Sequence, residues 1–146
     1  MLFRERLTVP VAWWVLAALF AVSMLAAIGF YLGPAWGIGV AVVSMGAAAL
    51  IFTTMGVVVS VDDTELRIGR AVIERSYVGT VTALDAAATD RRGGVEADAR
   101  AHLVLKPYIR TAVEVVLDDP DDPVPYWLVS SRRPARLAAA LAGTGR

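Results

Sequence analysis

Charged residues are absent between Leu7 and Val61, and a short Gly/Pro segment at residues 33–37 divides this uncharged stretch in two. The apolar runs on either side cover about residues 11–32 and 38–55. Because a helix rises about 1.5 Å per residue, each run is long enough to cross, or nearly cross, a hydrocarbon core of roughly 30 Å. Backbone polar groups in lipid must be paired within the segment, so both runs are predicted to be helices. Residues 1–56 are therefore predicted to be a short tail followed by a transmembrane hairpin.

The remainder of the chain, residues 57–146, has the patterning of a small β domain. Short β-branched runs and period-two alternation predict strands at 57–61, 65–68, 71–75, 77–84, 102–106, 111–117 and 126–130. The first four strands follow one another too closely for intervening helices, so we expect an antiparallel meander. Residues 85–100 break the pattern and are predicted to be a loop with one helical turn.

An Ala/Leu-rich helix is predicted over about residues 132–142, with Ser131 as its N-cap and Gly143 as its stop. Seven strands followed by one helix is the order of a pleckstrin-homology-like (PH-like) barrel, in which the helix closes an open end of two packed sheets. Lipocalin-like and simple sandwich arrangements are also compatible with the pattern. The predicted fold class is a membrane α-helical hairpin followed by a mostly-β domain, either a PH-like barrel or a sandwich, with a C-terminal helix.

Composition and charge add four constraints. A hydrophobic content of 57% and a mean hydropathy of +0.59 exceed those of an ordinary soluble domain. The net charge of zero gives no bulk attraction to nucleic acid, and the lack of cysteine excludes disulfides and thiolate chemistry. Arginines flank the helices at positions 4, 6, 67, 70 and 75, whereas the intervening turn has none, so the positive-inside rule places both termini in the cytoplasm.

Several segments carry a resemblance to a known family. They are Arg4–Leu7, the uncharged hairpin, Val61–Gly69, Lys106–Arg110 and, most distinctively, Asp121–Pro134. In these segments the chain resembles an actinobacterial family of two-helix membrane proteins known only as a domain of unknown function. The resemblance covers nearly the whole chain and implies a plasma-membrane protein. It implies no activity, ligand or catalytic residue.

Candidate chemistry in the β domain is sparse. The acidic run at residues 118–122 lacks the alternation, central glycine and terminal glutamate of an EF-hand, so a solvated turn is favoured over a metal site. His102 has no nucleophile or carboxylate that the sequence places beside it, and there is no glycine-rich phosphate loop. The sequence therefore predicts a protein that is not an enzyme and that has no metal or cofactor.

The segment 121–133 combines carboxylates, prolines, aromatic residues and paired arginines. Tyr126 and Trp127 point to opposite faces of a strand, and we assign Trp127 to the core, with a mainly stabilising role for Leu128 as well. Tyr126 is then the expected contact residue. The predicted partner surface consists of Asp122, Tyr126, Arg132 and Arg133.

These observations predict a non-enzymatic, membrane-anchored interaction module that displays a β domain at the cytoplasmic face. The alternative is a module that binds anionic lipid headgroups, with Lys106 and Arg110 as the lipid contacts. The competing interpretation is that the basic residues form salt bridges on the protein surface and do not bind lipid. The expected partners are membrane lipids and a membrane protein of unknown identity, with no nucleic acid, and the oligomeric state is left open.

Overall fold

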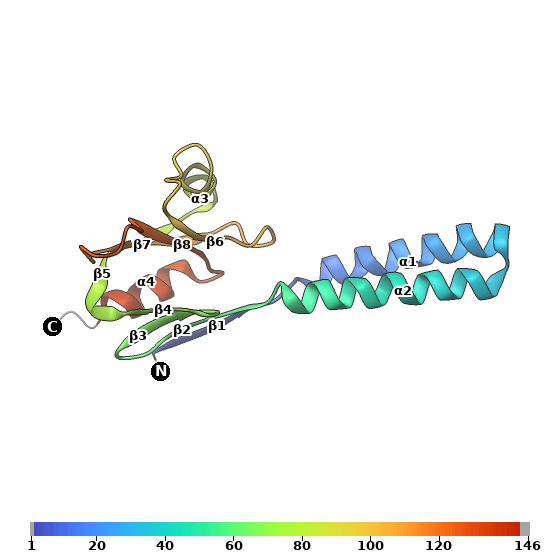
Figure 1. Cartoon of the computed structure of the whole chain (residues 1–146), viewed down its shortest axis with the longest axis horizontal. Coiled ribbons are helices and arrows are strands. Elements are labelled where there is room, and N and C mark those ends of the chain that lie inside the picture. The colour runs from blue at the N-terminus through green and yellow to red at the C-terminus, as the bar shows by residue number, and fades with distance from the viewer. Residues whose placement is uncertain (1, 144–146) are drawn as a thin grey trace. The chain divides into compact units, whose positions relative to one another are not determined.

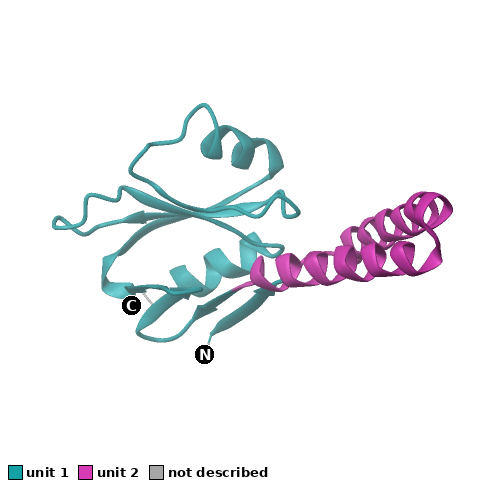
Figure 2. Ribbon diagram, turned by 45° about the vertical axis from the view of Figure 1, so that its right-hand side comes forward, with its two compact units in different colours: residues 1–7, 58–146 teal, residues 8–57 magenta. Residues whose placement is uncertain are grey.

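The computed structural model describes residues 2–143, and the chain divides into two compact units (Figure 2). The helical unit covers residues 8–57, and the β unit combines residues 1–7 with residues 58–146. The helices are therefore an insertion within the β unit. This differs from the predicted division at residue 56, because the chain begins in the β unit, leaves it for the helices and then returns.

The helical unit consists of α1 (Val11–Leu32) and α2 (Pro34–Thr54). The predicted bounds of the first helix are confirmed, whereas the second helix begins earlier than Ile38. Gly33 alone makes the turn, with φ at 98°, a conformation that glycine adopts without the steric penalty of a side chain. Pro34 can open α2 because a proline in the first turn of a helix loses no hydrogen bond.

The two helices pack closely through glycine. A Cβ atom added at Gly37 would lie 2.7 Å from the Leu25 carbonyl oxygen and 2.8 Å from the Gly29 Cα, so only glycine fits there. Ala21 is the buried residue of α1. Most other apolar side chains are exposed, for example Val43 at 71%. By length and composition, both helices can cross a membrane.

The first sheet of the β unit has the order β1-β2-β3-β4, with strands at Phe3–Leu7, Val57–Val61, Glu65–Ile68 and Ala71–Glu74. Strands β2, β3 and β4 form the predicted antiparallel meander. The N–H group of Leu2 donates to the Val61 carbonyl, which places the start of β1 beside the end of β2. The predicted N-terminal tail is therefore wrong, since Phe3–Leu7 is an edge strand of this sheet.

The second sheet has the order β5-β7-β8-β6, with strands at Val78–Leu84, Ala112–Leu117, Tyr126–Ser130 and His102–Val104. The predicted meander does not continue into β5, because the short helix η1 (Arg75–Tyr77) separates it from β4 and β5 pairs with β7. Strand β6 runs parallel to β8. Residues 85–100, predicted to be mostly loop, contain α3 (Ala86–Gly93), which the Asp85 side chain caps by accepting from the Ala88 N–H group at 2.8 Å.

The C-terminal helix α4 (Pro134–Ala142) lies between the two sheets, and α3 lies on the outer side of the second sheet (Figure 1). Leu137 and Leu141 are the buried residues of α4. Arg75 donates to the carbonyls of Ala140 and Leu141 at 3.0 and 2.7 Å, so a cation meets the negative end of the helix dipole. The coarse prediction is confirmed: two long apolar helices precede a β-rich domain with two sheets and a C-terminal helix.

Candidate binding surfaces of the β unit

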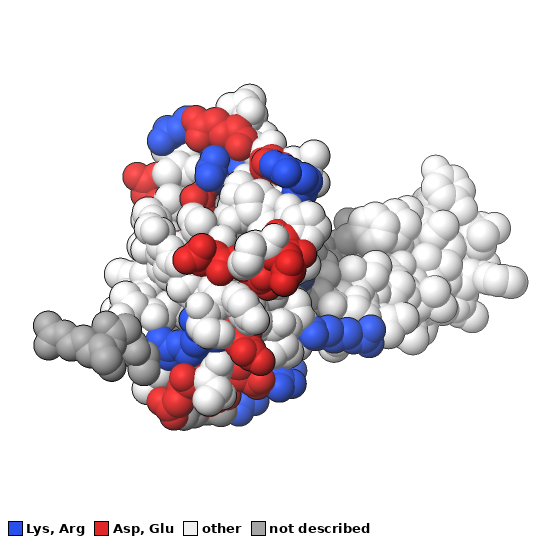
Figure 3. All heavy atoms as spheres, turned by 60° about the vertical axis from the view of Figure 1, so that its left-hand side comes forward, with Lys and Arg blue, Asp and Glu red and all other residues white. Residues whose placement is uncertain are grey.

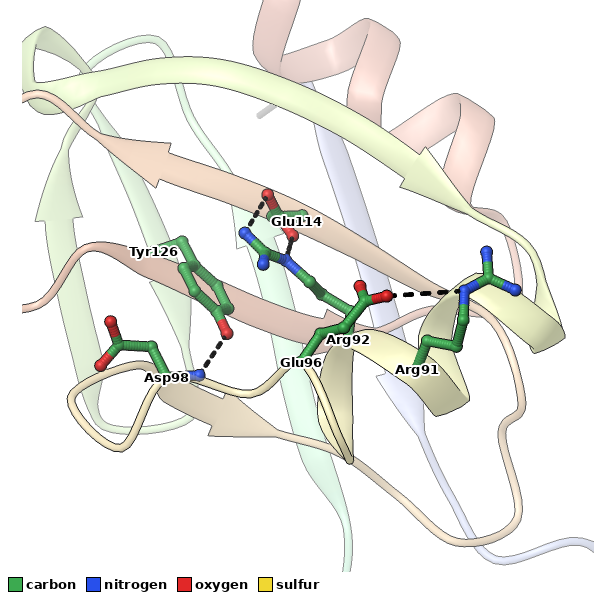
Figure 4. Close-up of polar contacts among 6 residues, drawn as sticks. All are labelled: Arg91, Arg92, Glu96, Asp98, Glu114 and Tyr126. Carbon is green, nitrogen blue, oxygen red and sulfur yellow. Dashed lines mark hydrogen bonds and ion pairs between the residues drawn. The ribbon is translucent and has the colours of Figure 1, made fainter.

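Tyr126 is buried beneath α3, with 4% of its surface exposed. Its hydroxyl oxygen accepts a hydrogen bond from the Asp98 N–H group at 2.9 Å, and the guanidinium of Arg92 lies 4.3 Å above its ring (Figure 4). Arg92 is held in turn by both carboxylate oxygens of Glu114. These contacts fix α3 and the following loop on the second sheet.

The prediction that Tyr126 is an exposed contact residue is therefore wrong. Strand β8 is an inner strand, between β7 and β6, and all five of its residues are buried. When a strand is covered on both faces, its sequence does not alternate between apolar and polar residues, so the sequence does not show which side chains reach solvent. Trp127 is buried as predicted, at 7% exposure, and its ring lies 4.9 Å from that of His102.

The ionisable groups around Tyr126 support the same structural interpretation. The hydrogen bond to Glu114 raises the pKa of Arg92. The hydrogen bond from Arg100 lowers the pKa of Asp98, which lies in the loop after α3. In both cases the hydrogen bond between the two side chains stabilises the charged form of the group, which is the form that the ion pair needs. The contacts among Tyr126, Arg92, Glu114 and Asp98 therefore hold α3 and its following loop against the second sheet.

The acidic connection between β7 and β8 is organised by its own side chains. The Asp122 carboxylate accepts a hydrogen bond from the Val124 N–H group at 2.9 Å, and the Asp119 carboxylate accepts one from the Asp121 N–H group at 3.0 Å. Such bonds between an aspartate and the backbone two residues later stabilise tight turns. Asp122, which was predicted to contact a partner, has a local role in this turn.

Ser131 joins the two sheets. Its hydroxyl donates to the Glu5 carboxylate at 2.6 Å, and Glu5 also accepts from the Arg132 N–H group at 3.0 Å. The predicted N-cap role of Ser131 is wrong, because the N-cap position of α4 is Arg133 and no side chain caps it. Arg132 and Arg133 are exposed, and their contact with a partner stays a prediction.

Lys106 and Arg110 lie together on one wall of a hollow of about 470 Å³ between α3 and the turn that joins β6 to β7. Apolar groups of Leu105, Pro107 and Ile109 form part of the same wall, and Thr89 lies on the α3 side. The structure thus brings together the two residues that were predicted to contact lipid. It does not bring them together with Asp122 or Tyr126, because β8 and its preceding turn contribute nothing to this hollow.

Sequence reasoning missed three residues that position these surfaces. Glu5 was treated as part of a tail, although its segment carries the family resemblance. Tyr108 was not singled out, yet its hydroxyl donates to the Leu7 carbonyl at 3.3 Å and ties the β6–β7 turn to the end of β1. Burial raises the pKa of Tyr108, which favours the neutral hydroxyl that makes this bond. Thr89 carried no signal, since it lies in a stretch with weak periodicity.

The described part of the chain, residues 2–143, contains no group of three or more His, Asp or Glu side chains placed to hold a metal ion. Together, the inserted apolar hairpin and the two-sheet unit define a small protein with a candidate membrane anchor and a β domain. Over residues 2–141 the chain matches the family described as protein of unknown function (DUF3093), and it belongs to that family. No curated protein and no solved structure matches it.

Proposed function

We propose that the protein is a non-enzymatic interaction module, anchored in the plasma membrane by its helical hairpin, with its β unit and both termini in the cytoplasm. The main observation in support is that the hairpin is inserted between two neighbouring strands of one sheet. The β unit is therefore connected to the anchor twice, through residues 8–10 and 55–56. Two connections restrict a domain more than one linker does, and restriction before binding lowers the entropy lost on docking.

The connections are also short. Residues 8–10 reach about 10 Å at full extension, which is close to the Debye length at physiological salt. A β unit on such connections stays near the headgroups of the membrane that holds its hairpin. That location suits a partner which is itself bound to the membrane, because both molecules are then confined to the same thin layer.

The cytoplasmic orientation is supported by the distribution of arginine. Arg4 and Arg6 precede α1, and Arg67 and Arg70 follow α2, whereas the turn at Gly33 has no charged residue. Figure 3 shows charged side chains on the β unit and none on the visible face of the helices. The positive-inside rule assigns the arginine-flanked ends to the cytoplasm.

A binding role is favoured over catalysis by how the candidate nucleophiles are used. Ser130 and Ser131 are fully buried, and their hydroxyl oxygens accept hydrogen bonds from the N–H groups of Lys106 and Arg133, respectively. His102 packs against Trp127. A catalytic serine needs access to substrate as well as a base, and neither serine is accessible, although the Ser131 hydroxyl donates to the Glu5 carboxylate.

The surface we propose for a protein partner is the exposed pair Arg132 and Arg133, beside Arg6 of β1. The guanidinium of Arg132 lies 3.5 Å from the Arg6 carbonyl oxygen, so arginine-bearing segments from before and after the hairpin are neighbours there. Arginine is enriched in interfaces because it forms several hydrogen bonds and packs its flat face.

Affinity purification of the full-length chain from native membranes in mild detergent tests this proposal. Arg133→Ala should reduce recovery of a partner without lowering the abundance of the protein, whereas Arg67→Ala, an exposed arginine of the first sheet, should leave recovery unchanged. Recovery of the wild-type chain alone, at several expression levels, would count against a stable partner.

Binding of anionic lipid headgroups is a second candidate function. The observation that favours it is the position of Lys106 and Arg110 on one wall of the same hollow. Each cation near an anionic surface contributes about 1 kcal/mol.

A further inference from the structure

The β unit has ends of opposite charge. We call the end at which β1 finishes and β2 starts the connection end. The β3–β4 turn lies at this end, because the Gly69 N–H group donates to the Val58 carbonyl. The β6–β7 turn also lies there, because the Tyr108 hydroxyl donates to the Leu7 carbonyl. The basic residues at this end are Arg6, Arg70, Lys106, Arg110, Arg132 and Arg133.

The opposite end is acidic. Arg75 donates to the Asp62 carbonyl at 3.1 Å, and the Asp118 N–H group donates to the Tyr77 carbonyl at 2.8 Å. Because Arg75 and Tyr77 both belong to η1, these bonds bring the β2–β3 and β7–β8 connections to the same end. The aspartates of these two connections are residues 62, 63, 118, 119, 121 and 122. Figure 3 brings this end forward and shows acidic groups gathered near its middle.

The carboxylates at the connection end are already engaged. Glu5 accepts from Ser131 and Arg132, and Asp85 caps α3. Asp90 pairs with Arg110 at 3.8 Å, but both side chains are at least two-thirds exposed, so this pair contributes little and can open. The six basic residues of this end outnumber these three carboxylates, so the end is net positive.

The hollow lies at the same end. The Lys106 ammonium forms no ion pair within the described residues, and the hydroxyl oxygen of Thr89, in the opposite wall, is buried without a hydrogen-bond partner. Apolar groups of Leu105, Pro107 and Ile109 line the hollow beside the cations. A ligand that matches these walls has an anionic group next to an apolar portion, which is the chemistry of a phospholipid at the junction of headgroup and glycerol.

We propose that the hollow lined by Lys106 and Arg110 binds the phosphate headgroup of an anionic phospholipid from the membrane that holds the hairpin. The inference rests on the proposed membrane anchoring, because the short connections keep the connection end within reach of the headgroups. The acidic end, repelled by the same surface, then faces the cytoplasm. Lipid binding at this hollow orients the β unit on its two connections.

The test uses the full-length chain in detergent micelles, with retained lipid measured by native mass spectrometry. Phosphatidylglycerol and phosphatidylcholine are the two probes, and inorganic phosphate is the soluble competitor. Loss of two cations at about 1 kcal/mol each corresponds to roughly 30-fold weaker binding. The double variant Lys106→Ala/Arg110→Ala should therefore lose phosphatidylglycerol by about that factor. Arg67→Ala/Arg100→Ala, which removes the same charge elsewhere, should bind like the wild type.

Three results would overturn the inference. Equal loss in the two double variants would mean attraction to net charge without a site. Equal retention of both lipids by the wild type would remove the preference for an anionic headgroup. Displacement of the lipid by millimolar phosphate would mean that the hollow holds a soluble anion. Failure of the proposed anchoring is a separate result: the chain would then be released from native membranes by alkaline carbonate.

Discussion

Ser131 and Glu5, separated by 126 positions in sequence, are joined by a 2.6 Å hydrogen bond from the serine hydroxyl to the glutamate carboxylate. Ser131 is completely buried and precedes α4, whereas Glu5 lies in β1, before the helical hairpin. The bond therefore fastens the strand that precedes the hairpin to the segment that connects the second sheet to the last helix. It makes the N-terminal residues part of the β unit.

Loss of the Glu5 carboxylate should destabilise the β unit. Glu5→Ala leaves the buried Ser131 hydroxyl and the Arg132 N–H group without their acceptor, at an expected cost of about 1–3 kcal/mol. Chemical unfolding of the full chain in detergent micelles, followed by near-ultraviolet circular dichroism, measures this cost. The neighbouring exposed residue supplies the control: Arg4→Ala should stay within about 0.5 kcal/mol of the wild type. Equal stability of the two variants would contradict the role of Glu5.

Tyr126 should behave as a core residue. Removing its ring with Tyr126→Ala leaves a cavity under Arg92 and should cost about 3–5 kcal/mol, a range measured for large aromatic truncations. Tyr126→Phe keeps the ring and removes only the acceptor for the Asp98 N–H group, at about 1 kcal/mol. Unfolding midpoints measured as for Glu5 separate the two effects. A Tyr126→Ala variant of wild-type stability would place this residue at a surface after all.

The helical hairpin should be replaceable by a tight turn. Because β1 and β2 are antiparallel neighbours, residues 8–57 can be exchanged for Asn-Gly, the dipeptide that favours two-residue β-hairpins. We expect this chain to be soluble and to show a cooperative thermal transition. A fragment that begins at Val57 lacks Leu7 and Glu5, exposes the edge of β2 and should aggregate. If both fragments fold equally well, β1 contributes little to the fold.

Gly37 should be essential for closure of the hairpin. Gly37→Ala places a Cβ within 2.8 Å of the backbone of Leu25 and Gly29, so the helices have to separate, at about 1–3 kcal/mol. Gly46, in the same helix, has nothing within 4 Å of an added Cβ, which makes Gly46→Ala the matched control. Titration with dodecyl sulfate should unfold the Gly37 variant at the lower fraction of denaturing detergent. Indistinguishable midpoints would contradict the close contact.

Much of this fold could be predicted from the sequence because the signals are local. The uncharged runs marked both helices, the β-branched run marked β2, and period-two alternation marked β3, with the bounds of both strands predicted to the residue. Strand β1 has no such alternation, because its central residues are Arg-Glu-Arg, and this sequence next to a long helix matches a cytoplasmic flank. Only the pairing with β2, which is a long-range contact, distinguishes a strand from such a flank.

The candidate site was harder to predict, for a related reason. Lys106 and Arg110 are close in sequence, so a turn brings them to one hollow, and their predicted contact with lipid stays a prediction. The partner surface assumed that the aromatics of β8 alternate between core and solvent. The strand is instead covered by α3 on its second face, and the helix lies where the periodicity was too weak to predict it. The connection of Ser131 to Glu5 has no local signal at all.

The most direct test of the account is the side of the membrane on which each unit lies. The chain contains no cysteine, so single cysteines can be introduced without background labelling. Ala35→Cys reports on the turn of the hairpin, and Asp121→Cys reports on the acidic end of the β unit. In right-side-out membrane vesicles, an impermeant maleimide should label the variant at 35 and leave the variant at 121 unlabelled until the membrane is permeabilised. Labelling of position 121 in intact right-side-out vesicles would contradict the cytoplasmic, membrane-anchored β unit.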